Sequence, residues 1–188
     1  MTRIFATLAS VNGLALVATF LFGVWSWLHG AVRQSADSLY LIHFTLGLFS
    51  AIGTLLVHCI IFTYFLGTGR WVKEVKIAYN LPDAPWPLLT RELKRKTFPP
   101  ALAAMLVTIA TAAAGAGVQL REWPWPVHGS LAVATLLVNL WACLIEYRNV
   151  RINAGAIVEV LHEVDRIRAA RGLPSNAEAL ERLGEQGS

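Results

Sequence analysis

Four long runs of apolar residues, separated by polar segments, dominate the pattern along this chain. The runs cover residues 4–28, 39–66, 99–120 and 126–147. At a rise of 1.5 Å per residue, each run is long enough to cross a hydrocarbon layer of about 30 Å as an α-helix. We therefore predict an all-α integral membrane protein, in which a bundle of four transmembrane helices forms a domain over residues 1–151.

Residues 152–188 are soluble in character and predict a cytoplasmic, amphipathic helical tail. The apolar residues between Gly155 and Arg171 recur at helical spacing and form one stripe. This stripe could lie on the membrane, cover the central loop or pair with a partner. Ser175 and Glu178 have the spacing of a capping box, which predicts a short final helix. No internal repeat is apparent along the chain.

The segment between the second and third runs, residues 67–98, is strongly basic. Its cationic residues are Arg70, Lys73, Lys76, Arg91, Lys94, Arg95 and Lys96. The two other loops carry Arg33 and Arg121. The positive-inside rule therefore places this loop and both termini in the cytoplasm. Asn80 and Pro85 interrupt the loop, which predicts two short interfacial helices that lie against anionic lipid headgroups.

The composition supports a membrane protein and excludes several other classes. Hydrophobic residues make up 55% of the chain, and the mean hydropathy of +0.52 is too high for a soluble domain of this length. A net charge of +4 would suit nucleic acid, but the basic residues cluster beside the membrane spans, so we expect no nucleic-acid partner. The two cysteines lie inside apolar runs, which excludes a disulfide framework. We expect a multi-pass protein of a bacterial-type inner (plasma) membrane.

Polar residues recur on one face of the second and fourth runs. In the second run, His43 and His58 are separated by roughly 22 Å along a helix, which places one in each leaflet. In the fourth run, His128, Asn139 and Glu146 lie near one face. Ionisable side chains at membrane depth usually face a protein interior and often serve a function. We therefore expect these two helices to face each other inside the bundle.

Two histidines about four turns apart on one transmembrane helix, with Gly47 one turn after the first, resemble the b-type cytochromes. The resemblance rests on spacing and covers the second run only. It implies haem b held between helices by pairs of axial ligands. The implied haem-iron ligands are His43 with His128 or His29 in the outer leaflet, and His58 with Met105 or Cys143 in the inner leaflet. The inner leaflet departs from the family pattern, because no second histidine lies at the depth of His58.

Each of these residues also has a purely structural interpretation. His58 could donate a hydrogen bond to Thr54 or to a backbone carbonyl, and Met105 is an ordinary filler of gaps between helices. We expect Glu146 to pair with a basic residue of the loop and His162 to face solvent.

Three functions remain open. No serine–histidine–acid set, HExxH motif or intramembrane carboxylate pair is found, so the chain has no self-contained catalytic constellation and is at most a redox subunit. The best specific hypothesis is an electron-transfer or quinone-site subunit of a larger membrane complex. The alternatives are a cofactor-free accessory or assembly protein, which associates with other subunits or with itself, and a proton or small-solute pathway along His58, Asn139 and Glu146.

Overall fold

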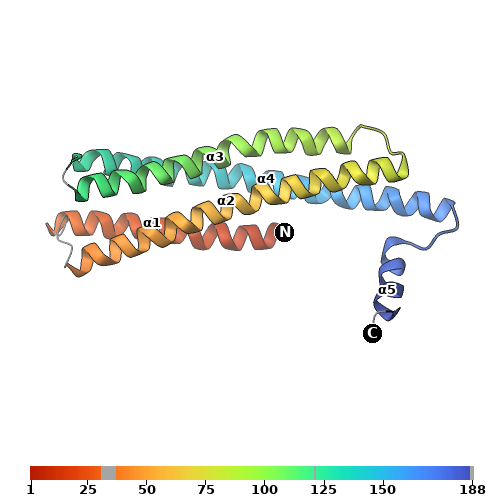
Figure 1. Cartoon of the computed structure of the whole chain (residues 1–188), viewed down its shortest axis with the longest axis horizontal. Helices are drawn as coiled ribbons and strands as arrows, with labels where there is room; N and C mark the ends of the chain where they lie inside the picture. Colours follow the sequence, from red (N-terminus) through yellow and green to blue (C-terminus); the bar gives the residue numbers. More distant parts are fainter. Residues whose placement is uncertain (31–36, 121, 187–188) are drawn as a thin grey trace.

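A computed structural model describes residues 1–30, 37–120 and 122–186, and these residues form helices connected by short segments, with no strand among them (Figure 1). The helices are α1 (Thr2–Leu28), α2 (Ser38–Tyr79), α3 (Trp86–Gln119), α4 (Trp125–Ala170) and α5 (Asn176–Gln186). The first four are each long and apolar enough to cross a membrane. The prediction of an all-α protein with four such helices is confirmed.

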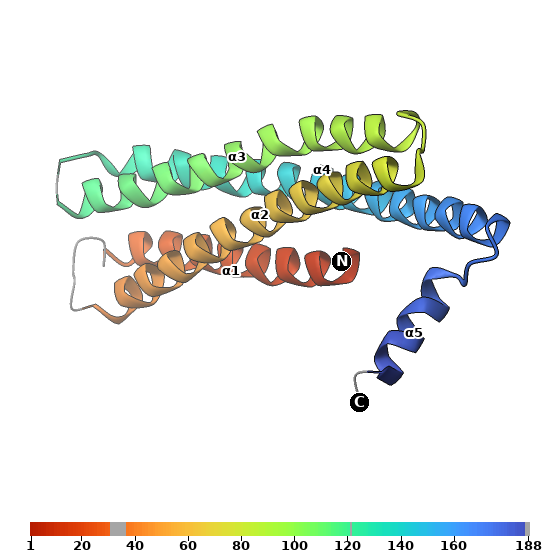
Figure 2. The ribbon, with the colours of Figure 1, turned by 45° about the vertical axis from the view of Figure 1, so that its right-hand side comes forward.

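Helices α1 to α4 run side by side, and α1 covers only part of the length of the three longer helices (Figures 1 and 2). Helix α1 packs along α2, and α3 packs along α4, so the chain forms two helical hairpins. The hairpins contact each other through α2 with α3 and through α1 with α4, which encloses an interior between the four helices. The turn between α2 and α3 lies at the opposite end of the bundle from the last turns of α1 and α3 (Figure 1).

The polarity of the four helices is inverted relative to a soluble bundle. Large apolar side chains point outward, and Leu14 and Phe49 are 71% and 67% exposed. Polar side chains such as Ser50, Thr54 and Asn139 are buried between the helices. Water would disfavour this arrangement, whereas a hydrocarbon solvent favours it. The side-chain pattern therefore supports a lipid environment around the four helices.

The ends of α2 and α3 differ from the prediction of two separate interfacial helices. Residues 67–79 continue α2 without a break, and α3 begins at Trp86, well before the apolar run at residue 99. Only residues 80–85 leave the helical path, where Asn80 ends α2 in the left-handed conformation with φ of 53°. The end of an apolar run marks the expected membrane boundary, but a helix ends only at a stop signal.

The apolar face of the α2 extension packs against protein. Leu81 is buried with Val160 and Val164 of α4, and they are joined by partly buried hydrophobic residues that include Trp71 and Tyr79. Helix α4 runs through the predicted boundary at residues 151/152 without interruption. The stripe on the tail therefore covers the ends of α2 and α3, the second of its three predicted roles.

The predicted capping box is present at the start of α5. The Ser175 backbone N–H donates to Glu178 Oε2 at 2.8 Å, and the Glu178 N–H donates to Ser175 Oγ at 3.3 Å. The Asp165 carboxylate on α4 accepts from the backbone N–H and the side-chain amide of Asn176, each at 2.8 Å. These bonds hold the first turn of α5 to the end of α4.

Candidate functional site

A cavity of about 630 Å³ lies between all four long helices, near the ends where each hairpin turns. We call it the histidine cavity, because His43 of α2 and His128 of α4 both line it. Its walls are almost entirely apolar and rich in glycine and alanine. Trp27 of α1 and Trp125 of α4 also line it, with ring centres 4.7 Å apart. Concave apolar sites with a few polar groups are the usual form of a ligand-binding site.

The two histidines of the cavity are brought together from different hairpins. Their ring centres are 6.0 Å apart, and the ring planes are inclined at 74°. His43 Nδ1 lies 2.9 Å from the carbonyl oxygen of Thr19, and His128 Nδ1 lies 3.0 Å from that of Thr111. A carbonyl oxygen only accepts, so Nδ1 carries a hydrogen in both rings. In the neutral imidazole the lone pair is therefore on Nε2, for which no hydrogen-bond partner is found among the described residues.

Each ring rests against a glycine of the neighbouring helix. A Cβ atom on Gly23 would lie 2.7 Å from Cε1 of His43, and one on Gly115 would lie 3.1 Å from Cε1 of His128. The first distance is too short for any side chain, and the second is tight. Each glycine follows, by four residues, the threonine whose carbonyl accepts from that histidine. One helical turn of α1 and one of α3 therefore seat the two imidazoles in the same way.

The two hairpins have a similar local pattern around their histidines. Residues 42–50, IHFTLGLFS, correspond to residues 127–135, VHGSLAVAT. Ser50 Oγ lies 3.0 Å from the hydroxyl of Thr19, and Thr135 Oγ1 lies 2.6 Å from that of Thr111. Equivalent positions therefore make equivalent bonds. The similarity is limited to a few inward-facing positions, while the lipid-facing positions require only apolarity.

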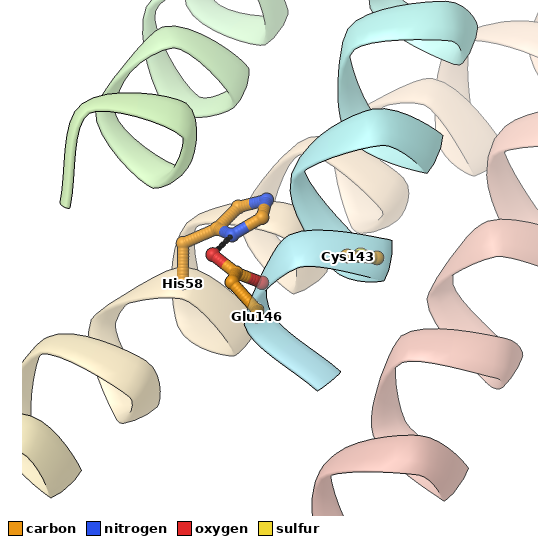
Figure 3. Close-up of side chains that lie close together, drawn as sticks. All are labelled: His58, Cys143 and Glu146. Carbon is orange, nitrogen blue, oxygen red and sulfur yellow. Dashed lines mark hydrogen bonds and ion pairs between the residues drawn. The ribbon is translucent and has the colours of Figure 1, made fainter. Parts of the chain in front are cut away.

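A second polar site, which we call the buried cluster, consists of His58, Cys143 and Glu146 (Figure 3). His58 Nδ1 lies 2.7 Å from Glu146 Oε1, and these side chains are only 1% and 0% exposed. The pairing of Glu146 with a basic loop residue is therefore wrong. Glu146 follows Asn139 by two helical turns, so it shares the inward face of α4 instead of reaching the loop.

Asn139 fixes the protonation of the other ring nitrogen of His58. The Asn139 amide donates through Nδ2 to the carbonyl of Thr135 at 2.9 Å and to Thr108 Oγ1 at 3.2 Å. Its oxygen then faces His58 Nε2 at 3.2 Å. An amide oxygen only accepts, so Nε2 carries a hydrogen. Nδ1 is therefore the nitrogen that shares a proton with Glu146.

The remaining predicted ligands lie outside the histidine cavity. His29 is exposed at the end of α1, where its ring contacts the backbone oxygen and indole of Trp25. Met105 is half-buried on α3 and is not among the described residues that line the cavity. Both ring nitrogens of His58 have protein partners, so it presents no free nitrogen to a haem.

The residues of the pathway hypothesis are connected, but the connection ends inside the protein. Glu146, His58 and Asn139 are hydrogen bonded in series, and Asn139 continues to Thr108 and Thr135 at the edge of the histidine cavity. At the other end, Glu146 is fully buried, and its Oε2 has no hydrogen-bond partner. Among the described residues, this series of hydrogen bonds therefore reaches the histidine cavity at one end and stops at Glu146 at the other.

Comparisons with known protein families, with curated proteins and with solved structures find no match to this chain. The function therefore has to be argued from the two polar sites themselves.

Proposed function

We propose that this chain is a membrane-embedded electron-transfer protein that holds one b-type haem in the histidine cavity, with His43 and His128 as axial ligands. The observation that carries this proposal is the separation of 6.0 Å between the two ring centres. Bonds from a metal to an imidazole nitrogen are about 2.0–2.1 Å long, so two rings on opposite sides of one ion have centres roughly 6 Å apart.

The surroundings of the two rings also suit a metal-bound cofactor. Histidine ligands to metals usually donate their other N–H to a carbonyl or carboxylate, which fixes the tautomer and the orientation of the ring. The carbonyls of Thr19 and Thr111 accept such bonds from His43 and His128. The cavity volume of about 630 Å³ lies within the range of roughly 300–1,000 Å³ that is typical of cofactor sites.

A haem bound at this site would accept and release one electron at a time. The protein contributes two imidazoles and an apolar wall that excludes water. It also contributes the backbone carbonyls of Thr19 and Thr111, which accept hydrogen bonds from Nδ1 of the two rings. Axial ligand identity, burial and hydrogen bonding to the ligands are the means by which a protein sets a haem potential. We assign no haem to His58, because Asn139 and Glu146 occupy both of its nitrogens.

The absorption spectrum of the detergent-purified protein tests this proposal. After expression with a sufficient haem supply, we expect a Soret band, reversible reduction and about one haem per chain. The cofactor-free accessory hypothesis predicts no such band, so a colourless protein that also fails to take up added haem would overturn the proposal. Transport of protons or solutes has no support beyond the buried network described above.

A matched pair of glycine variants tests the seat of His43. In Gly23→Ala the new methyl group would lie 2.7 Å from the His43 ring, so we expect displacement of the ring and loss of most of the haem. Gly13→Ala on the same helix has no atom within 4 Å of the new Cβ. We expect this control to keep its haem and to gain about 0.5–1 kcal/mol of stability, because alanine favours the helix. Equal haem content in the two variants would exclude a close fit of His43 against Gly23.

We further propose that the turn between α2 and α3 and both termini face the cytoplasm of a bacterial-type cell, where the chain works as a subunit of a larger membrane complex or as a homo-oligomer. The basic residues around the turn support this orientation, and exposed cations such as Lys73 and Arg95 suit anionic headgroups. Modification of single cysteines introduced at position 83 and near residue 30, in intact cells, would distinguish the two orientations.

A further inference from the structure

We infer that the buried cluster of His58, Cys143 and Glu146 is a second metal site, which binds a divalent ion of the Zn²⁺ type. The inference does not depend on haem, because the cluster lies outside the histidine cavity: none of its three residues is among those that line it. One ligand atom of each side chain lies within 4.8 Å of the other two. Around one zinc ion, ligand atoms lie roughly 3.3–3.8 Å apart, so the Cys143 sulfur needs to approach by up to about an ångström. His58 Nδ1 and Glu146 Oε1, now 2.7 Å apart, need to separate by roughly 0.6 Å as the ion replaces the hydrogen bond between them.

The second observation is an unsatisfied carboxylate oxygen. Glu146 is fully buried, yet its Oε2 has no hydrogen-bond partner among the described residues. Figure 3 shows Oε1 directed at His58 and the second oxygen turned away from it. A buried acceptor without a donor is costly and needs an explanation. A cation bound at this carboxylate would provide the missing interaction.

The third observation is the equal spacing of metal-ligating residues on α2 and α4. His58 follows His43 by fifteen residues, and Cys143 follows His128 by the same fifteen residues. His58 and Cys143 therefore lie equally far along their helices from the paired histidines His43 and His128. At both depths, one metal-ligating side chain of α2 lies near one of α4. Glu146, one turn after Cys143, adds a third ligand at the depth of His58 only.

Charge balance favours a divalent ion at this depth. Without metal, the cluster holds one proton shared between His58 Nδ1 and Glu146 and one proton on the Cys143 thiol, and its net charge is zero. Binding of M²⁺ releases both protons and forms bonds to the neutral imidazole, the carboxylate and the thiolate. The net charge remains zero, which avoids the cost of a buried charge within the membrane. A monovalent ion that displaced the same two protons would leave one negative charge.

The donor set also selects the class of metal. One nitrogen, one sulfur and one oxygen ligand suit Zn²⁺ or Co²⁺, whereas Mg²⁺ and Ca²⁺ prefer oxygen alone. Asn139 supports coordination through Nδ1, because its oxygen accepts from the Nε2–H of His58. Such a bond from the distal ring nitrogen is the usual partner of a metal-bound histidine.

The test uses the full chain in detergent, once as wild type and once as the haem-free His43→Ala/His128→Ala variant. Each is treated with chelator, titrated with Zn²⁺ and separately with Co²⁺, and analysed for bound metal. We expect one ion per chain in both backgrounds, two protons released per ion in weakly buffered solution, and a near-ultraviolet thiolate-to-cobalt absorption band. Loss of the haem with retention of the metal would separate the two proposals.

Cysteine variants provide the matched control. Cys143→Ser is expected to weaken Zn²⁺ binding on the order of 100-fold and to abolish the cobalt band, because a direct ligand is lost. Cys59→Ser removes the exposed cysteine of α2 and is expected to change neither. Helical circular dichroism of each metal-free variant confirms folding. Absence of metal from the folded wild type would overturn the inference, as would binding that Cys143→Ser leaves unchanged, since surface groups such as His162 would then be the ligands.

Discussion

Replacing His43 or His128 with alanine is expected to lower the haem content of the purified protein by about tenfold or more. Loss of the outer-shell partner of a metal ligand alone typically weakens binding 10–100-fold, and loss of the ligand itself is at least as damaging. The two rings have the same surroundings, a threonine carbonyl at Nδ1 and a glycine at Cε1. We therefore expect the two single variants to lose haem to a similar extent.

Haem content per chain and the Soret absorption, measured after identical purification, provide the comparison. His29→Ala and His162→Ala serve as controls, because both residues are exposed and lie outside the histidine cavity. If both cavity variants kept a wild-type spectrum, the ligands would have to lie elsewhere. If only one variant lost its haem, a single-ligand site would replace the bis-histidine arrangement.

The course of the helices was predictable from the sequence only as far as the lipid boundary. Apolar runs give the number of spans, because each span must satisfy its own backbone and present an apolar surface. They do not show where a helix ends in water. The extensions of α2 and α4 are held by contacts between residues distant in sequence, such as Leu81 with Val160. The amphipathic stripes were visible in the sequence, but their partner was not.

The candidate site was also only partly predictable from the sequence. The pairing of His43 with His128 was proposed from depth alone, since both lie near the same end of their spans, and the structure brings the two rings together. The groups that orient these rings are the backbone carbonyls of Thr19 and Thr111, and no side-chain pattern identifies a carbonyl acceptor. The glycines at positions 23 and 115 each follow one of these threonines by four residues, a spacing that is visible in the sequence.

The partner of His58 was the main error at the site. Glu146 lies at the end of an apolar run, where a charged residue usually reaches water or a basic neighbour. Its helical phase relative to Asn139 was the better guide, because inward-facing positions of α4 recur every three or four residues. The position of Glu146 at the end of the span predicted a partner in the basic loop, whereas its helical phase predicted an inward-facing side chain. The structure agrees with the helical phase.

The second large effect is expected from breaking the pair of His58 and Glu146. In His58→Ala, Glu146 keeps its burial and loses its remaining partner, so both carboxylate oxygens become unsatisfied. Removing one member of a buried polar or charged pair costs about 2–5 kcal/mol. We expect a loss of this size in the free energy of unfolding, measured by reversible denaturation in mixed micelles with chelator present to exclude metal.

Two further variants distinguish the loss of the hydrogen bond between His58 and Glu146 from the loss of side-chain volume. Glu146→Gln can donate from its amide to Nδ1 of a neutral His58, so we expect a loss of only about 1 kcal/mol. The double variant His58→Phe/Glu146→Leu replaces both partners with apolar groups of similar size, and such replacements are often neutral or stabilising. Its stability should therefore exceed that of His58→Ala. If the double variant were the less stable of the two, the unsatisfied carboxylate would not be the main cost in His58→Ala, and the polar contacts of this position, including the bond from His58 to Asn139, would govern its stability.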